Sequence, residues 1–208
     1  MKAVVLLNLG GPTTREAIEP FLYNLFRDPD VIRLPFFLRP FQDFLARRIA
    51  RKRTPESAAN YDLIGGSSPL LKNTELQAKA LEEALGPEYR VLTCMRYWHP
   101  RADEVVTQLR ELQPEEIFLL PLYPQYSIST TLSSFNDFER VMEAADWDFP
   151  LTRIGYFFDR PAYADAVADT VRGALGDCVL EDTHLLFSAH GVPVSYVDKF
   201  GDPYRDHV

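Results

Sequence analysis

The sequence has few cysteines and no long apolar run. Only two of its 208 residues are cysteine, Cys94 and Cys178, and they stand far apart. A disulfide framework and a zinc knuckle both need closely spaced cysteines, so both are excluded, and unpaired cysteines fit a reducing compartment. No apolar run approaches the roughly 20 residues that cross a bilayer, and the first apolar stretch is too short for a signal peptide. We therefore expect a cytoplasmic protein, with at most a peripheral contact to a membrane.

Positive charge is also scarce, except in one segment. Lys and Arg number 22 against 30 Asp and Glu, a net charge of −8, which argues against a nucleic-acid partner. Residues 33–53 differ, because they hold seven basic residues and one acid and so carry +6. With 46% hydrophobic and 25% charged residues, the chain has the composition of a globular protein somewhat longer than one average domain.

Short apolar runs alternate with segments of helical period along the chain. This order predicts an α/β fold, a Rossmann-like, doubly wound parallel sheet with helices on both faces. Thr13 and Glu16 have the spacing of a capping box, which predicts a helix that begins there. The expected strands are 3–8, 89–95, 116–122 and 152–157, and the expected helices are 13–26, 74–85, 102–112, 135–145 and 162–175.

The last part of the chain repeats the pattern of its beginning. Residues 184–188 are a fifth apolar run before a Gly-x-Pro turn, as residues 3–8 are. We expect a first domain over 1–178 and, over 179–208, the first strand and histidine loop of a second, similar domain. About twenty residues follow the fifth run, too few for the crossover helix and partner strand of a parallel pair. We therefore expect this second domain to be truncated and its unpaired strand to favour a homo-oligomer.

Loops after the expected strands carry residues suited to a ligand site. Open α/β sheets bind ligands at the carboxyl ends of their strands, and Arg96 follows one strand there, where it can pair with a carboxylate. Residues 61–70 combine an aromatic ring with two glycines and two serines, and residues 123–131 add hydroxyls and aromatic rings. The glycines at 10–12 lack the Gly-x-Gly-x-x-Gly spacing of a dinucleotide site, which favours a simple tight turn.

His190 follows the fifth apolar run and precedes Gly191. Its imidazole is expected at the end of that run, where it can bind a metal or accept a proton. The alternative is a histidine that hydrogen-bonds a loop carbonyl. No other histidine stands at a metal-ligand spacing from it, so any metal site is expected to be open.

Aromatic and basic residues are interleaved in segment 36–53. An apolar series recurs there at helical spacing: Phe37, Phe41, Phe44, Leu45 and Ile49. The series predicts one amphipathic helix with its arginines off the apolar face. Such a cationic helix can lie at a membrane interface, and the alternative is a helix that packs on its own domain.

Together these motifs resemble the ferrochelatase family. The resemblance rests on five groups of residues: Leu7-Asn8-Leu9-Gly10-Gly11-Pro12; Tyr61 with Ile64-Gly65-Gly66 and Ser68-Pro69; Arg96-Tyr97-Trp98-His99-Pro100; Tyr123-Pro124-Gln125-Tyr126-Ser127; and Phe187-Ser188-Ala189-His190 with Gly201-Asp202-Pro203-Tyr204. It covers the whole chain and about the first two thirds of a typical ferrochelatase.

The resemblance implies an enzyme of haem biosynthesis with two similar Rossmann-like domains around a cleft. Its substrates would be Fe²⁺ and protoporphyrin IX or coproporphyrin III, with no resident cofactor and no iron–sulfur cluster. His190 would be the catalytic residue, as metal ligand or as proton acceptor. The residues implied to line the porphyrin pocket are Leu9, Arg53, Tyr61, Ser68, Arg96 and Tyr97. Segment 36–53 matches the lip over that pocket.

The chain departs from the family pattern in three ways. The family's second catalytic group, a carboxylate across the cleft, has no counterpart, so we expect little turnover by the chain alone. Phe200 makes the interval from His190 to Gly201 one residue longer than usual, and Leu132 replaces a small residue. The alternative functions are a porphyrin or haem carrier without catalysis and a related cobaltochelatase.

Overall fold

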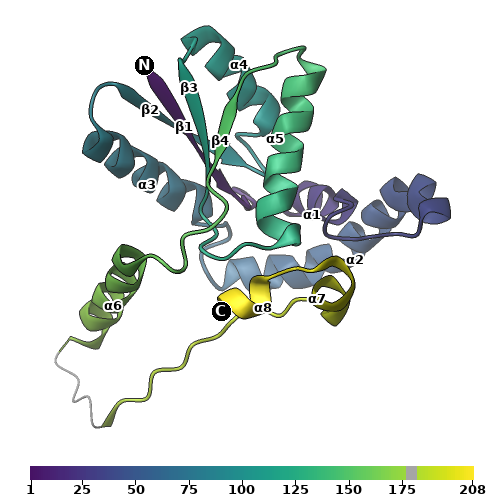
Figure 1. Ribbon diagram of the computed structural model, residues 1–208. Helices are drawn as coiled ribbons and strands as arrows, with labels where there is room; N and C mark the ends of the chain where they lie inside the picture. The colour runs from purple at the N-terminus through teal and green to yellow at the C-terminus, as the bar shows by residue number, and fades with distance from the viewer. Residues whose placement is uncertain (177–181) are drawn as a thin grey trace.

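The computed structural model of the chain describes residues 1–176 and 182–208. Four parallel strands form one sheet in the order β2-β1-β3-β4 (Figure 1). The strands are β1 (Lys2–Asn8), β2 (Tyr89–Met95), β3 (Glu116–Pro121) and β4 (Leu151–Arg153). The predicted α/β fold with a parallel sheet is confirmed.

Helices cover both faces of the sheet and its carboxyl edge. α3 (Leu70–Leu85) lies against one face, and α4 (Ala102–Leu112) and α5 (Ser133–Ala144) lie against the other (Figure 1). α1 (Ile18–Arg27) and α2 (Gln42–Asp62) pack on each other beyond the end of β2. Further helical elements are η1 (Phe36–Phe41), η2 (Ile128–Leu132), α6 (Pro161–Leu175), α7 (Val194–Phe200) and α8 (Tyr204–His207).

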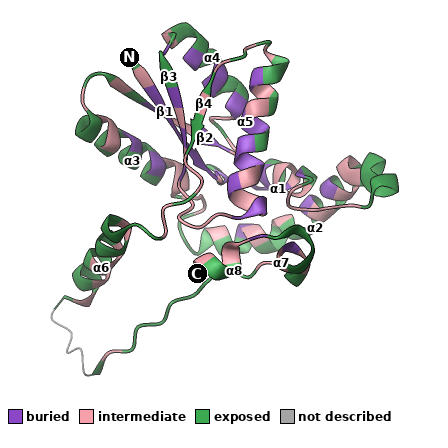
Figure 2. Ribbon diagram, in the orientation of Figure 1, coloured by how far each residue is buried: buried purple, intermediate pink, exposed green. Residues whose placement is uncertain are grey.

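The side chains of β1 alternate between two buried clusters. Ala3, Val5 and Leu7 pack with residues of α4 and α5, whereas Val4 and Leu6 pack with residues of α3. Both faces of β1 are therefore apolar, which is typical of a central strand in a sheet covered on both sides. Figure 2 shows the buried residues concentrated on the sheet and on the helix surfaces that face it.

The strand order places a switch point beside β1. The chain goes from β1 to β2 on one side and then to β3 on the other side. In open α/β sheets, ligands bind in the crevice outside the carboxyl ends of the strands at such a point. The loops after β1, β2 and β3 are therefore where a ligand site is expected.

Several predicted element boundaries are wrong, and α3 begins four residues before the predicted start at 74. α1 begins at Ile18 and not at the predicted capping box, and the Thr13 hydroxyl oxygen caps no helix but accepts a hydrogen bond from Trp98 Nε1 (3.2 Å). β4 is shorter than the predicted strand 152–157, because it is an edge strand that pairs with β3 over three residues only.

The predicted fifth strand at 184–188 is also wrong. Residues 183–193 belong to neither helix nor strand, and Leu186 and Phe187 are 94% and 74% exposed. A strand needs a neighbour to receive its backbone hydrogen bonds, and this segment pairs with none in the described part of the chain. The predicted domain boundary at 178/179 lies outside the described residues, and the two-domain division stays a prediction.

The basic segment forms two elements and not the single helix predicted. Residues 36–41 are a 3₁₀ helix that contains Pro40, and α2 begins only at Gln42. Ala50 and Ala58 of α2 are buried in the cluster formed with α1, so this part of the helix does pack on its own domain. The exposed aromatic residues at its start, called the aromatic lip below, are Phe36, Phe37, Phe41 and Phe44.

Candidate functional site

Leu9, Arg96 and Tyr97 meet at the carboxyl ends of β1 and β2. The parallel pairing of these strands continues beyond Met95, since the Arg96 N–H donates to the Asn8 carbonyl (2.8 Å) and the Tyr97 N–H donates to the Leu9 carbonyl (3.0 Å). Leu9 and Tyr97 also belong to one apolar cluster. The structure therefore brings these three residues together, and their role in binding a porphyrin stays a prediction.

Tyr61 and Ser68 approach the same edge from the other side of the β1 loop. The Ser68 N–H donates to the Pro12 carbonyl (2.8 Å), and Tyr61 packs in the cluster that contains Leu9. A Cβ at Gly11 would lie 2.4 Å from Ser68 Oγ and 4.0 Å from the Tyr61 hydroxyl, so only glycine allows this close approach. Leu9, Tyr61 and Ser68 therefore lie around the loop that follows β1, and the three are named here the β1 wall.

Arg53 lies on α2, eight residues before Tyr61, or about 12 Å along the helix axis. Its side chain is 59% exposed, and its Nη1 lies 3.3 Å from a carboxylate oxygen of Glu56. An exposed pair of this kind is weak, so the guanidinium can exchange Glu56 for another carboxylate at little cost.

Arg96 and Tyr97 are held from beneath by a buried acid that sequence reasoning missed. Asp28, which follows α1, has a side chain only 1% exposed. Its Oδ2 accepts hydrogen bonds from Arg96 Nη2 (2.8 Å) and from the Tyr97 hydroxyl (2.6 Å), and also from the Ser133 hydroxyl. Burial, and then the Asp28 charge, raises the pKa of Tyr97 well above its ordinary value. Tyr97 is therefore a neutral hydrogen-bond donor.

The rest of the Arg96 guanidinium is also engaged within the protein. Its Nε donates to Ser133 Oγ (2.8 Å), and its Nη1 lies 3.4 Å from a carboxylate oxygen of Asp137. Asp137 is itself buried and accepts from Arg140 Nη2 (2.7 Å). Arg96 therefore pairs with carboxylates, as its position at a strand end predicts, but these belong to the protein itself: Asp28 after α1 and Asp137 on α5. A buried arginine needs acidic partners, and the sequence gives no other indication that Asp28 and Asp137 have this role.

His190 lies on the segment between residue 182 and α7, and its side chain is exposed. It borders a pocket of about 390 Å³ whose wall includes Val192, Val197, Asp198 and Tyr204. None of the residues of the β1 wall lines this pocket. The structure therefore places His190 outside the cluster formed by the other predicted residues, although α7 and α8 reach the same end of the molecule (Figure 1).

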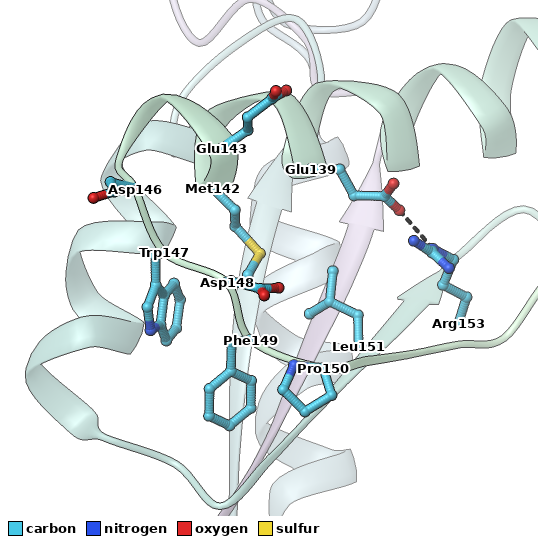
Figure 3. A pocket seen from close by; sticks show the side chains of 10 residues that line it. All are labelled: Glu139, Met142, Glu143, Asp146, Trp147, Asp148, Phe149, Pro150, Leu151 and Arg153. Carbon is cyan, nitrogen blue, oxygen red and sulfur yellow. Dashed lines mark hydrogen bonds and ion pairs between the residues drawn. The ribbon is translucent and has the colours of Figure 1, made fainter.

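A second hollow lies at the opposite end of the sheet, between the end of α5 and the start of β4 (Figure 3). It measures about 570 Å³ and is lined by Met142, Trp147 and Phe149, with Arg153 Nε 2.5 Å from Glu139 Oε1. It contains none of the residues that the sequence predicts for the site. The amino ends of parallel strands are also not where such sheets bind ligands.

The described residues offer no preformed metal site and no membrane span. Across 1–176 and 182–208, no three His, Cys, Asp or Glu side chains are grouped as metal ligands would be. No helix in the same two ranges is long and apolar enough to cross a bilayer. The expectation of an open metal site at His190 stays a prediction.

The fold is an open α/β sheet, and the β1 wall lies at its switch point. A sequence model of the family described as Ferrochelatase matches residues 1–208, and the chain belongs to this family. Relatives named ferrochelatase are 46% identical in Geobacter metallireducens, 45% identical in Aquifex aeolicus and 47% identical in Thermosynechococcus vestitus, each over 99% of this chain. The chain spans 64%, 64% and 54% of the lengths of these relatives. The predicted resemblance is confirmed.

Proposed function

We propose that the chain binds a porphyrin against the β1 wall and takes part in the insertion of Fe²⁺ to form haem. The porphyrin is protoporphyrin IX or coproporphyrin III. The observation that carries this proposal is the convergence of Leu9, Tyr61 and Ser68 at the switch-point edge of a chain from the ferrochelatase family. Apolar and aromatic atoms suit the flat face of a macrocycle, and a serine hydroxyl suits its polar rim.

The chemistry of insertion requires proton removal and metal desolvation but no oxidation. The porphyrin loses two pyrrole N–H protons, Fe²⁺ loses bound water, and four nitrogen–iron bonds form. Since iron and porphyrin are complete reactants, we assign the protein no resident cofactor and no iron–sulfur cluster. The Arg53 guanidinium meets a propionate at the pocket mouth, and Arg96 and Tyr97 support the wall from beneath.

His190 contributes the lone pair of a neutral imidazole. That lone pair accepts a pyrrole proton or binds the arriving iron, and it cannot do both at once. Walls that hold a bent porphyrin better than a flat one would point its nitrogens at the metal and draw on binding energy for the strain. Both contributions favour the metallation step itself.

The role of the β1 wall in porphyrin binding can be tested by adding one methyl group at Gly11. Gly11→Ala puts a carbon within 2.5 Å of Ser68 Oγ and Cβ, so Ser68 must shift. We expect porphyrin affinity to fall about tenfold or more, measured by the fluorescence of protoporphyrin IX during titration. Gly173→Ala on α6 is the matched control, because a Cβ there meets nothing within 4 Å. Equal affinities for both variants would remove the β1 wall from the proposal.

Metal insertion separates this function from its alternatives. In the longest polypeptide that carries this sequence, tight porphyrin binding without incorporation of Fe²⁺ or Zn²⁺ would favour a carrier, and a strong preference for Co²⁺ would favour a cobaltochelatase. The family membership of the chain favours iron.

The aromatic lip is proposed as a peripheral contact with a membrane for a protein that is otherwise cytoplasmic. Phe36, Phe37, Phe41 and Phe44 are each more than half exposed, beside the basic residues of segment 36–53. Exposed aromatic rings next to cations suit the interface of an anionic bilayer. Partition into a membrane would also bring the pocket close to a hydrophobic porphyrin.

Vesicle co-sedimentation tests this contact. We expect binding that rises with the anionic lipid fraction, and a loss of about tenfold or more when Phe37, Phe41 and Phe44 are all replaced by serine. Leu76→Ser is the matched control, since Leu76 is 58% exposed on α3, away from the lip. Vesicle binding that does not change with the anionic lipid fraction would contradict the membrane proposal.

A homo-oligomer is proposed to form through the exposed segment 184–188. Leu185, Leu186 and Phe187 present apolar side chains and unpaired backbone groups, which a second copy can cover. Light scattering is expected to give a mass above that of one chain, and Leu186→Asp is expected to lower it. A monomer at all concentrations would contradict this proposal.

A further inference from the structure

The Gly201-Asp202-Pro203-Tyr204 motif has no task in the proposed reaction, yet its acid is buried. Asp202 is 2% exposed although it carries a carboxylate. Its Oδ2 accepts hydrogen bonds from the Ser127 hydroxyl and from the Ile128 backbone N–H, both at 2.8 Å. Its Oδ1 accepts from the Tyr204 N–H at 2.9 Å. The side chain therefore ties the last helices to the loop that follows β3.

Asp202 acts as a helix cap supplied from a distant part of the chain. Ile128 begins η2, which continues directly into α5, so its N–H belongs to a helix start. The first N–H groups of a helix lack partners within it and carry partial positive charge, and a carboxylate stabilises both features. The cap is 74 residues away in sequence, so it joins α5 to the segment that carries α7 and α8.

Other contacts hold the same segment on both sides of Asp202. The Tyr196 hydroxyl of α7 donates toward the carbonyls of Asp30 (2.9 Å) and Val31 (2.8 Å). The Arg33 guanidinium lies 4.4 Å from the Phe200 ring centre. At the other end, His207 Nδ1 accepts from the Tyr126 N–H (3.2 Å) and its ring stacks on Phe158 at 4.2 Å. Asp202 is the one charged, buried member of this set.

Anchoring this segment restricts where His190 can be. Three residues separate His190 from Val194, the first residue of α7. Four extended residues span at most about 14 Å, so the His190 Cα stays within that radius of an anchored helix. Without the anchor, residues 182–208 have no hydrogen-bonded sheet to hold them.

We propose that Asp202 is a positioning residue that fixes α7 and α8 on the carboxyl edge of the sheet and so limits how far His190 can lie from that edge. The role of His190 rests on the proposed function, whereas the anchor does not. The two parts therefore need separate readouts.

Hydrogen exchange of the 208-residue chain tests the anchor. In Asp202→Ala, we expect amides of α7 and of residues 128–134 to exchange about tenfold faster or more, because both sides of the cap are released. Asp202→Asn keeps a side-chain oxygen of the same shape and is expected to retain most of the protection. The control is Asp206→Ala, which removes the same charge from an exposed position on α8. Unchanged protection in Asp202→Ala, or equal loss in Asp206→Ala, would overturn the anchor.

Zinc insertion into protoporphyrin IX, measured in the longest polypeptide that carries this sequence, tests the positioning of His190. For Asp202→Ala we expect kcat to fall about tenfold or more with the porphyrin KM unchanged, because the β1 wall is not touched. We expect Asp202→Asn to have a kcat close to that of the parent protein. A raised KM with an unchanged kcat would overturn the positioning role. Absence of insertion in every variant would count against the proposed function, while the exchange data would still decide the anchor.

Discussion

His190→Ala is expected to lower the rate of metal insertion about 100- to 10,000-fold, the range that a positioned acid–base group contributes. The imidazole is the group of the proposed site that offers a neutral lone pair to a proton or to iron, and alanine offers none. Porphyrin affinity is expected to stay within about twofold, because His190 is not part of the β1 wall. The measurement is zinc-porphyrin fluorescence over time, in the longest polypeptide that carries this sequence.

His184→Ala is the matched control for His190→Ala. His184 lies on the same segment and is exposed as well, so its loss changes composition without touching the proposed chemistry. We expect its insertion rate to equal that of the parent. A His190→Ala protein that inserts metal at the parental rate would remove His190 from the mechanism, whatever the control does.

Asp28→Ala is expected to destabilise the protein by about 3–5 kcal/mol, the usual cost of breaking a buried ion pair by removing one partner. The variant leaves Arg96, only 13% exposed, without its closest carboxylate, and it leaves the hydroxyls of Tyr97 and Ser133 without their acceptor. In a chain of this length the melting temperature is expected to fall by about 10 °C or more. Calorimetry or circular dichroism measures this change.

Two further variants show whether the loss of stability in Asp28→Ala comes from the burial of its ion pair. Asp62→Ala breaks an exposed ion pair, since the Asp62 and Arg15 side chains are 45% and 61% exposed. We expect it to lower the free energy of unfolding by less than about 1 kcal/mol. The double variant Asp28→Leu with Arg96→Met removes both charges and is expected to recover part of the lost stability. An Asp28→Ala protein that melts within about 2 °C of the parent would contradict the assignment of Asp28 as the hub of this network.

Local pattern was enough to predict the sheet and the approximate place of the ligand wall. The central strand β1 reads as a continuous apolar run because it is covered on both faces, and that is a property of consecutive residues. Parallel strands bring their carboxyl ends to one edge, so the positions of Arg96 and Tyr97 followed from the order of the strands. Leu9, Tyr61 and Ser68 were placed there by the family resemblance.

Features that depend on a distant partner could not be predicted. Thr13 has the spacing of a helix cap, but its hydroxyl is taken by Trp98, 85 residues later. The run 184–188 has strand composition, but no described strand lies beside it. Asp28 and Asp202 look like ordinary surface acids in the sequence, and their burial depends on groups 68 and 74 residues away.

The amino-acid sequence by itself determined the α/β class and the family, and the family resemblance implied the residues of the β1 wall. The class follows from the pattern of consecutive side chains, and the family follows from short motifs that keep their spacing in any fold of the chain. Only the tertiary structure decided that the aromatic lip is exposed, that Arg96 is held by buried acids, and that Asp202 ties α7 to α5. The physical reason is that burial and long-range hydrogen bonds depend on which surfaces meet, and that is settled only when the whole chain has packed.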